Sequence, residues 1–412
     1  MSDEKFLQSK HFCVLPWMHA RVNQDGSVYP CCRMENFYSY GSLKDKSFNE
    51  IWNDPAIRNM RNTLKKDLAF SSCSDCYNIE AQNGISLRQR ANSDFSEHIA
   101  KVAETHDDGR IAATGLEFID LRFSNICNFK CRTCNYENST SWYQDARNFV
   151  TESVPTEPIR THESAGQLWA FIRQQLPTLK RIYLAGGEPL LHEEHYQLLE
   201  LLIAENRTDI AIEYNTNLST IEYKHWKATE LWKQFPHITV GASLDGVNRQ
   251  AELIRKGMDW GKTYNNFLTI QNESPQVKFI LAPTISVLNC FHITVAIEEF
   301  VQNGMLGNPD FLRLNILLQP HYLNVQILNP KERHNLEQHY SAFLNRVKEI
   351  LTPKLYFKID SELNRILTHM SSASPKDGDR LRFRKFTIKL DSLRKEKTAL
   401  LFPELFDLIY EG

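Results

Sequence analysis

Three cysteines in the segment NICNFKCRTCN have the spacing to hold a reactive metal centre: Cys127, Cys131 and Cys134. Three thiolates with no histidine among them can ligate three corners of a [4Fe-4S] cluster and leave the fourth iron without a protein ligand. That iron could then take part in chemistry. Structural zinc instead takes four protein ligands, often as two CxxC pairs or as cysteines mixed with histidines. The spacing therefore favours a cluster over zinc or ordinary buried thiols.

Most of the other cysteines lie near the start of the chain. A hairpin turning at Asp25-Gly26 is predicted to deliver the adjacent Cys31 and Cys32, and a helical segment leads on to Cys73 and Cys76. Of the 9 cysteines, only Cys290 stands apart, and we interpret it as a small buried apolar residue. In a cytosolic chain this clustering indicates metal ligation more than disulfides. The polar residues nearby carry no signal beyond a solvated surface, among them His11, His19 and Asp45.

Short apolar runs alternate with helix-length stretches in the middle of the chain, which predicts βα units around a parallel sheet. The expected fold is α/β, a partial (β/α)6 barrel of the TIM-like kind, with a small cysteine-rich α+β domain before it and a helical region after it. The predicted strands are 117–123, 181–184, 210–214, 238–243, 277–285 and 311–318.

Functional groups in such folds follow the carboxyl ends of the strands, and polar residues recur there in this chain. The cysteine loop follows the first predicted strand directly. The second is followed by two glycines that let the backbone approach a ligand closely, and then by a carboxylate. The residues at strand ends are Gly186, Gly187, Glu188, Asn217, Ser243 and Asp245.

With 412 residues the chain is long enough for about two or three domains. We predict a cysteine-rich domain over 1–100, a polar linker over 101–114, a core domain over 115–330 and a helical extension over 331–412.

The charge balance argues against two classes of partner. Lys and Arg number 48 against 50 Asp and Glu, so no global basic field would attract nucleic acid or an anionic membrane. The start MSDEKFLQSK lacks the features of a secretory signal, and no run of about 18 apolar residues occurs. We therefore expect a cytoplasmic protein without a nucleic-acid or membrane partner.

The motifs CNFKCRTC and AGGEP, each after a predicted strand, resemble those of the radical S-adenosylmethionine (radical SAM) superfamily over roughly 115–330. The resemblance implies that Cys127, Cys131 and Cys134 hold a [4Fe-4S] cluster whose open iron binds S-adenosylmethionine. Reductive cleavage then yields a 5′-deoxyadenosyl radical, with an electron donor such as flavodoxin or ferredoxin.

The same resemblance implies a set of cofactor-binding residues. Gly186, Gly187 and Glu188 would contact the methionine amino group, and Asn289 would contact the adenosyl group. For the ribose and carboxylate the candidates are Asn217, Ser243 and Asp245. Arg255 could pair with a substrate or cofactor carboxylate, or could equally be a solvated helix charge.

The N-terminal cysteines lie in a series that resembles a SPASM or twitch domain: Cys13, Pro16-Trp17, DGSVYPCC, EIW and CSDC. Such domains usually follow the core domain, whereas this one precedes it. The resemblance implies an auxiliary [4Fe-4S] cluster on Cys13, Cys31, Cys73 and Cys76. Cys32 competes with Cys31, because adjacent strand residues point to opposite faces. A zinc-ribbon-like site remains the alternative, since four cysteines suit zinc as well.

The expected function is that of a radical enzyme that abstracts hydrogen from a substrate, with a peptide or protein side chain as the first choice of target. The alternative substrate is a small molecule, such as a sugar or an amino acid derivative. A non-catalytic metal-binding or electron-transfer module is a third possibility, but it leaves the GGEP loop and the polar strand ends unexplained. No general acid or base can be chosen from the sequence.

Overall fold

The computed structural model describes residues 6, 8–34, 39–81, 84–112, 115–161 and 165–410. The chain divides into two compact units. The first comprises Met1–Asn125, Glu157–Glu213 and Gln234–His237, and the second comprises Ile126–Thr156, Tyr214–Lys233 and Ile238–Gly412.

The sheet of the first unit joins the N-terminal segment to the first predicted core strand. Strand β1 (His19–Val22) pairs antiparallel with β2 (Val28–Tyr29) and parallel with β3 (Phe118–Leu121). Strand β3 pairs in parallel with β4 (Arg181–Leu184). The predicted hairpin at Asp25-Gly26 is confirmed, with Gly26 at a φ of 87° and its N–H donating to the carbonyl of Asn23 at 2.9 Å. Sequence reasoning did not foresee the pairing of β1 with β3.

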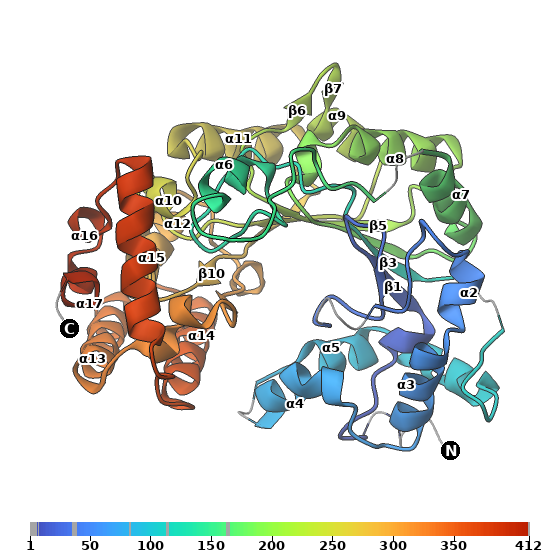
Figure 1. Cartoon of the computed structure of the whole chain (residues 1–412). Helices are drawn as coiled ribbons and strands as arrows, with labels where there is room; N and C mark the ends of the chain where they lie inside the picture. The colour runs from blue at the N-terminus through green and yellow to red at the C-terminus, as the bar shows by residue number, and fades with distance from the viewer. Residues whose placement is uncertain are drawn as a thin grey trace. The chain divides into compact units, whose positions relative to one another are not determined.

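Two early helices of the first unit begin at residues whose side chains cap them. Ser47 forms a capping box with Glu50 at the start of α2, and Asp54 caps α3, which begins at Pro55. In Figure 1 these blue helices lie near β1, and α7 and α8 follow in green. The helices are α2 (Phe48–Trp52), α3 (Pro55–Lys65), α4 (Ser74–Ala81), α5 (Leu87–Asp94), α7 (Ala165–Gln175) and α8 (Glu193–Ala204), with 3-10 turns η1 (Leu15–Trp17), η3 (Ser71–Cys73), η4 (Ser96–Glu104) and η6 (Pro189–Leu191).

Parallel pairing continues in the second unit, where β8 (Ile238–Ala242) pairs with β9 (Lys278–Leu281) and β10 (Thr284–Ile285) pairs with β11 (Asn315–Ile316). Strand β5 (Ala211–Thr216) is divided between the units, and β6 (Glu222–Tyr223) forms a hairpin with β7 (Trp226–Lys227).

Two predicted strands differ from those observed in the second unit. The run 277–285 is two strands, because Pro283 has no N–H to continue the ladder. Of the run 311–318, only residues 315 and 316 form a strand. The predominance of parallel pairs confirms the predicted α/β class.

Helices are the main regular elements of the second unit, and the predicted helical C-terminal region is confirmed. They are α6 (Tyr143–Ala146), α9 (Ala228–Trp232), α10 (Asn248–Ile254), α11 (Trp260–Glu273), α12 (Ile293–Gln302), α13 (Pro330–Val347), α14 (Pro353–Ser371), α15 (Asp379–Arg394), α16 (Thr398–Leu401) and α17 (Phe406–Tyr410). Over the described residues, no helix has the length and apolar content needed to cross a bilayer.

Candidate functional site

The loop that carries Cys127, Cys131 and Cys134 is held from two sides within the second unit. On one side, the N–H of Arg132 donates to the carbonyl of Ile254 at 2.7 Å, at the end of α10. On the other side, the indole of Trp142 donates to the carbonyl of Cys131 at 2.8 Å. The Ser141 hydroxyl likewise donates to the carbonyl of Cys127 at 2.7 Å. The loop backbone is therefore fixed on both sides before any ligand binds.

Two polar side chains reach the sulfur atoms of this loop. The Asn217 amide lies 3.8 Å from the Cys127 sulfur, and the Arg255 guanidinium lies 3.8 Å from the Cys131 sulfur. Burial raises the pKa of Cys131 and raises that of Cys134 to about 12, while the charge of Arg255 acts in the opposite direction on both. The buried thiols thus favour the protonated form, and a bound metal would be needed to hold them as thiolates.

Arg255 belongs to a buried polar network at the ends of β8 and β9. The Asp245 carboxylate accepts from Arg255 Nη2 at 2.9 Å and from the N–H of Thr284 at 2.7 Å. Arg255 is only 9% exposed, which rules out the solvated-charge interpretation. Asp245 Oδ2 and Arg255 Nε are buried and have no hydrogen-bond partner among the described residues. These two atoms are suited to the polar groups of a bound cofactor.

The other two predicted residues of the second unit hold backbone near this network. The Asn289 amide donates to the carbonyls of Asp245 at 2.8 Å and Thr284 at 3.0 Å. Both of its N–H groups are thus engaged, so Asn289 positions the loop that carries Asp245. The N–H of Ser243 donates to the carbonyl of Thr216 at 2.9 Å, directly before Asn217.

The glycine loop belongs to the first unit, where it follows β4. Gly186 and Gly187 have φ angles of 81° and 53°, a region that glycine adopts readily. A Cβ at Gly186 would lie 2.7 Å from the Cβ of Arg122, so the loop requires glycine for space as well. Glu188 is buried, and its carboxylate caps η6 by accepting from the N–H of Leu190 at 3.1 Å.

Four N-terminal cysteines line one cavity in the first unit. Cys13 precedes η1, Cys31 follows β2, Cys73 ends η3 and Cys76 lies on α4. Burial, and to a smaller extent the neighbouring thiols, raise the pKa of Cys13 and Cys31 and raise that of Cys73 to about 12. Within the described part of the chain, no three His, Cys, Asp or Glu side chains lie in positions from which they could together hold a metal ion.

Cys32 is exposed and does not line this cavity. The charges that act on Cys32 are those of Asp120, Arg122, Arg33 and Arg21, whereas Cys31 is influenced by Cys73 and Cys76 as well as by Cys32. The structure therefore separates the two adjacent cysteines. Cys290 is fully buried, as predicted.

Sequence reasoning missed several residues that support the N-terminal cysteines. His19 was interpreted as a surface residue but is only 2% exposed, and its Nδ1 lies 2.8 Å from the carbonyl of Pro30, next to Cys31. Arg88 also lines the cysteine cavity and donates to the carbonyls of Ser9 at 3.0 Å and Phe12 at 2.7 Å. A lone histidine or arginine carries no spacing signal, so neither residue could be identified beforehand.

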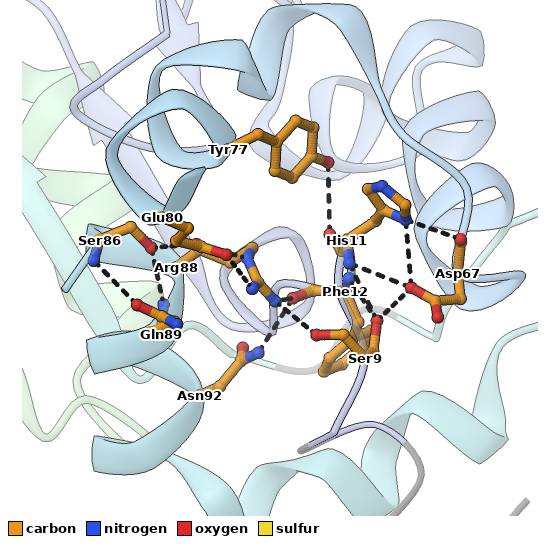
Figure 2. Close-up of polar contacts among 10 residues, drawn as sticks. All are labelled: Ser9, His11, Phe12, Asp67, Tyr77, Glu80, Ser86, Arg88, Gln89 and Asn92. Atoms are coloured by element: carbon orange, nitrogen blue, oxygen red, sulfur yellow. Dashed lines mark hydrogen bonds and ion pairs between the residues drawn. The ribbon is translucent and has the colours of Figure 1, made fainter. Parts of the chain in front are cut away.

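A second, larger cavity of about 880 Å³ lies between the N-terminal segment and helices α4 and α5. Figure 2 shows its network of polar contacts, in which Arg88 is paired with Glu80 beside the backbone of Ser9 and Phe12. Arg88 lines both cavities, and Tyr77, which lines the larger one, interacts with the Cys73 thiol.

Comparisons with known proteins identify two domains in this chain. The model of the SPASM iron–sulfur cluster-binding domain matches residues 13–77, and the model of the Radical SAM superfamily matches residues 121–279. The first match covers the five N-terminal cysteines, and the second covers Cys127, Cys131 and Cys134.

Two curated relatives are named GTP 3',8-cyclase. The protein from Aliarcobacter butzleri (strain RM4018) is 26% identical over 136 residues, which cover 33% of this chain and 36% of the relative. The protein from Sulfurimonas denitrificans (strain ATCC 33889 / DSM 1251) is 26% identical over 103 residues, which cover 25% and 27%. The chain thus spans about a third or less of the length of these relatives.

A solved structure described as "Native anSMEcpe with bound AdoMet and Kp18Cys peptide" is 19% identical, with a TM-score of 0.39. The match covers 57% of this chain and 59% of that chain.

Proposed function

Because the chain belongs to the radical SAM superfamily and carries a SPASM domain, we propose that it uses S-adenosylmethionine to abstract a hydrogen atom from a peptide or protein side chain. The cofactors of its two domains are a [4Fe-4S] cluster bound with S-adenosylmethionine and an auxiliary iron–sulfur cluster. When the first cluster is reduced and S-adenosylmethionine is bound to it, the two together supply a 5′-deoxyadenosyl radical. The protein's own task is to hold both groups and to exclude water.

In this proposal Cys127, Cys131 and Cys134 ligate the first cluster. The support is the loop that is fixed on both sides, together with the donors that approach two of its sulfurs. Asn217 and Arg255 each lie 3.8 Å from a cysteine sulfur. Hydrogen bonds and positive charge at ligating sulfurs raise the reduction potential of a cluster. Both residues would thus make the cluster easier to reduce.

The residues proposed to bind S-adenosylmethionine have different roles. Arg255 and Asp245 each offer a buried polar atom without a partner among the described residues, which suits the charged groups of the cofactor. For the methionine amino group we propose Gly186, Gly187 and Glu188, on the basis of the AGGEP motif. Asn217 and Ser243 complete the proposed set, and Asn289 would act by positioning the loop of Asp245.

For the auxiliary cluster we propose Cys13, Cys31, Cys73 and Cys76 as ligands. Four thiols on one cavity, with Cys32 outside it, support this set. The match to an iron–sulfur family model supports a cluster over zinc. A cluster with four thiolate ligands has no open iron for a substrate, so we propose that it transfers electrons.

Two observations point to different substrates. The SPASM match over residues 13–77 supports a peptide or protein target, because relatives with this domain often modify such substrates. The name of the curated relatives, GTP 3',8-cyclase, favours a small-molecule substrate as the second candidate.

The enzymatic proposal is tested by cofactor cleavage. The chain is purified without oxygen, reconstituted with iron and sulfide and reduced, and 5′-deoxyadenosine is measured after addition of S-adenosylmethionine. We expect cleavage by the native chain and none by Cys127→Ala. A reconstituted native chain that does not cleave the cofactor, or a Cys127→Ala variant that does, would contradict the proposal.

The auxiliary site is tested by iron content. Replacing both Cys73 and Cys76 by alanine should remove about four irons per chain, the content of one [4Fe-4S] cluster. Cys32→Ala is the matched control, because it removes a neighbouring thiol outside the cavity, and it should retain all the iron. Zinc in the native chain, with no iron lost in the double variant, would show a zinc site instead.

The substrate class is tested by comparing two additions to the reconstituted enzyme. A peptide mixture from a cell extract should raise the yield of 5′-deoxyadenosine and produce a peptide of altered mass. GTP should leave the yield unchanged. Stimulation by GTP alone would reverse the order of the two candidates.

A further inference from the structure

Helix α15 contacts the cysteine loop of the same unit from a position far away in the sequence. Arg132 lies within this loop, between Cys131 and Cys134, and its side chain is 0% exposed. Arg132 Nη2 lies 2.5 Å from Asp391 Oδ1, on the last turns of α15, and 2.6 Å from Glu396 Oε2. One of the two residues between the second and third cysteines is therefore held by two carboxylates of the C-terminal region.

The end of α15 is shaped to bring Glu396 back to this loop. Lys395 adopts a φ of 53°, and the N–H of Glu396 then donates to the carbonyl of Asp391 at 2.9 Å. Such a left-handed residue turns the chain back over the last turn of the helix. Asp391 also accepts from the N–H of Thr398 at 2.8 Å, and Glu396 pairs with Lys256 at 2.8 Å. The two carboxylates are thus fixed before they meet Arg132.

A second arginine, Arg394 on α15, approaches Cys131 through Trp142. Arg394 is 1% exposed, and its Nε lies 2.8 Å from Asp145 Oδ2. Its guanidinium carbon is 4.7 Å from the centre of the Trp142 ring, and Trp142 in turn donates to the carbonyl of Cys131. The positive charge of Arg394 lowers the pKa of Cys131 against the larger effect of burial.

Several donors of these two arginines have no acceptor within the part of the chain that the structure describes. Arg132 Nε and Nη1, and Arg394 Nη1 and Nη2, are buried and lack a hydrogen-bond partner among the described residues. A buried donor without a partner costs about 1–3 kcal/mol. Purely structural ion pairs would be expected to satisfy most of their donors. The buried donors that remain unsatisfied therefore indicate that a further hydrogen-bond acceptor belongs beside the cysteine loop.

We propose that the end of α15 is part of the cluster site, where Arg394 and the carboxylate-bound Arg132 set the reduction potential of the cluster. This inference rests on the proposal that Cys127, Cys131 and Cys134 hold that cluster. The family match ends at residue 279, so α15 lies outside the matched region. Arg394, Asp391 and Glu396 are positioning residues, because they act through the loop and through their charge.

The sign of the effect follows from electrostatics. Reduction adds negative charge to the cluster, so nearby positive charge favours the reduced form and nearby negative charge opposes it. Arg394→Met should lower the potential, and Glu396→Gln should raise it. We expect each change to alter the ratio of reduced to oxidised cluster about tenfold at a fixed solution potential. This corresponds to a shift of about 59 mV in the reduction potential of a one-electron couple.

The experiment is a redox titration of the full chain, reconstituted without oxygen and followed by the electron paramagnetic resonance signal of the reduced cluster. The control is Glu362→Gln on α14, which removes a similarly buried carboxylate paired with Lys358 and Arg365 at 2.7 and 2.5 Å. This control should lose stability without a change in potential. Arg394→Lys retains the charge and should keep most of the native potential.

Opposite shifts in Arg394→Met and Glu396→Gln support the inference, because a merely structural role would not produce opposite signs. A loaded chain in which both variants keep the native potential would overturn it. If Arg394→Met fails to fold, the inference is tested by the other two variants. A higher reduction potential in Glu396→Gln, together with a near-native potential in Arg394→Lys, would support it, and an unchanged potential in Glu396→Gln would overturn it. A native chain that forms no cluster on the three cysteines would overturn the proposed function and this inference together.

Discussion

Replacing Asp245 by asparagine should destabilise the second unit by about 3–5 kcal/mol, the cost typical of breaking a buried ion pair. Asparagine keeps the shape of the side chain but removes its charge. Arg255, which is 9% exposed and 2.9 Å from Asp245, then becomes a buried cation without its counterion. The N–H of Thr284, 2.7 Å from the carboxylate, loses a charged acceptor as well. The loss is a large part of the roughly 5–15 kcal/mol that stabilises a typical domain.

The assay is a double-mutant cycle, in which urea unfolding of the iron-free chain is monitored by tryptophan fluorescence. Asp245→Asn is compared with Arg255→Met and with the double variant that combines both changes. If the single change is costly because it strands a buried cation, removing that cation should restore at least half of the lost free energy. The coupling between the two positions should then be about 2 kcal/mol or more.

Two results would refute this reasoning. A loss below about 1 kcal/mol in Asp245→Asn would place the pair among weakly coupled surface ion pairs. Additive effects in the double variant would show that the two side chains do not stabilise each other, despite their distance of 2.9 Å. In either case the network at the ends of β8 and β9 would not be the rigid support assigned to it above.

Three further predictions concern the first unit. Tyr77→Phe removes a hydrogen-bond partner of the Cys73 thiol, so it should lower the potential of the auxiliary cluster in a redox titration, and an unchanged potential would contradict this role. Gly186→Ala should cost about 2–4 kcal/mol in urea unfolding, because a Cβ would meet Arg122 at 2.7 Å on a backbone with a φ of 81°. Gly166→Ala on α7, where a Cβ meets nothing within 4 Å, is the matched control and should not destabilise. Burial lowers the pKa of His195 from 6.5 to about 3, so in this window the unfolded chain binds a proton that the folded chain does not. Stability should therefore fall as the pH decreases from about 6.5 towards 3, and His195→Leu should flatten this part of the pH profile of urea midpoints, whereas an unchanged profile would exclude His195 as its cause.

Local signals allowed part of the structure to be predicted from the sequence. The predicted strand 181–184 forms β4 with the same bounds. Gly186 and Gly187 follow β4 and both have positive φ angles. Glycine adopts such angles readily, which is why a double glycine indicates a tight turn with a close backbone approach. These features depend on residues adjacent in the sequence, so composition and spacing are enough to find them.

Features that depend on distant residues could not be predicted in this way. Asp391 and Glu396 look like ordinary solvated charges near a helix end, because their partner Arg132 is more than 250 residues away. For Arg255 the sequence left open whether the side chain was a surface charge or a ligand, and only its burial against Asp245 decided the question. Pairing and burial of this kind have no sequence period that could reveal them.

The parallel pairing of β1 with β3 has a consequence for synthesis on the ribosome. The register pairs His19 with Phe118, so about a hundred residues must be translated before β1 gains this neighbour. At about 5–20 residues per second, that takes about 5–20 seconds. Throughout this time one edge of β1 is open to pairing with another nascent chain. Chains stopped before residue 118 should therefore aggregate more than chains that extend past residue 121.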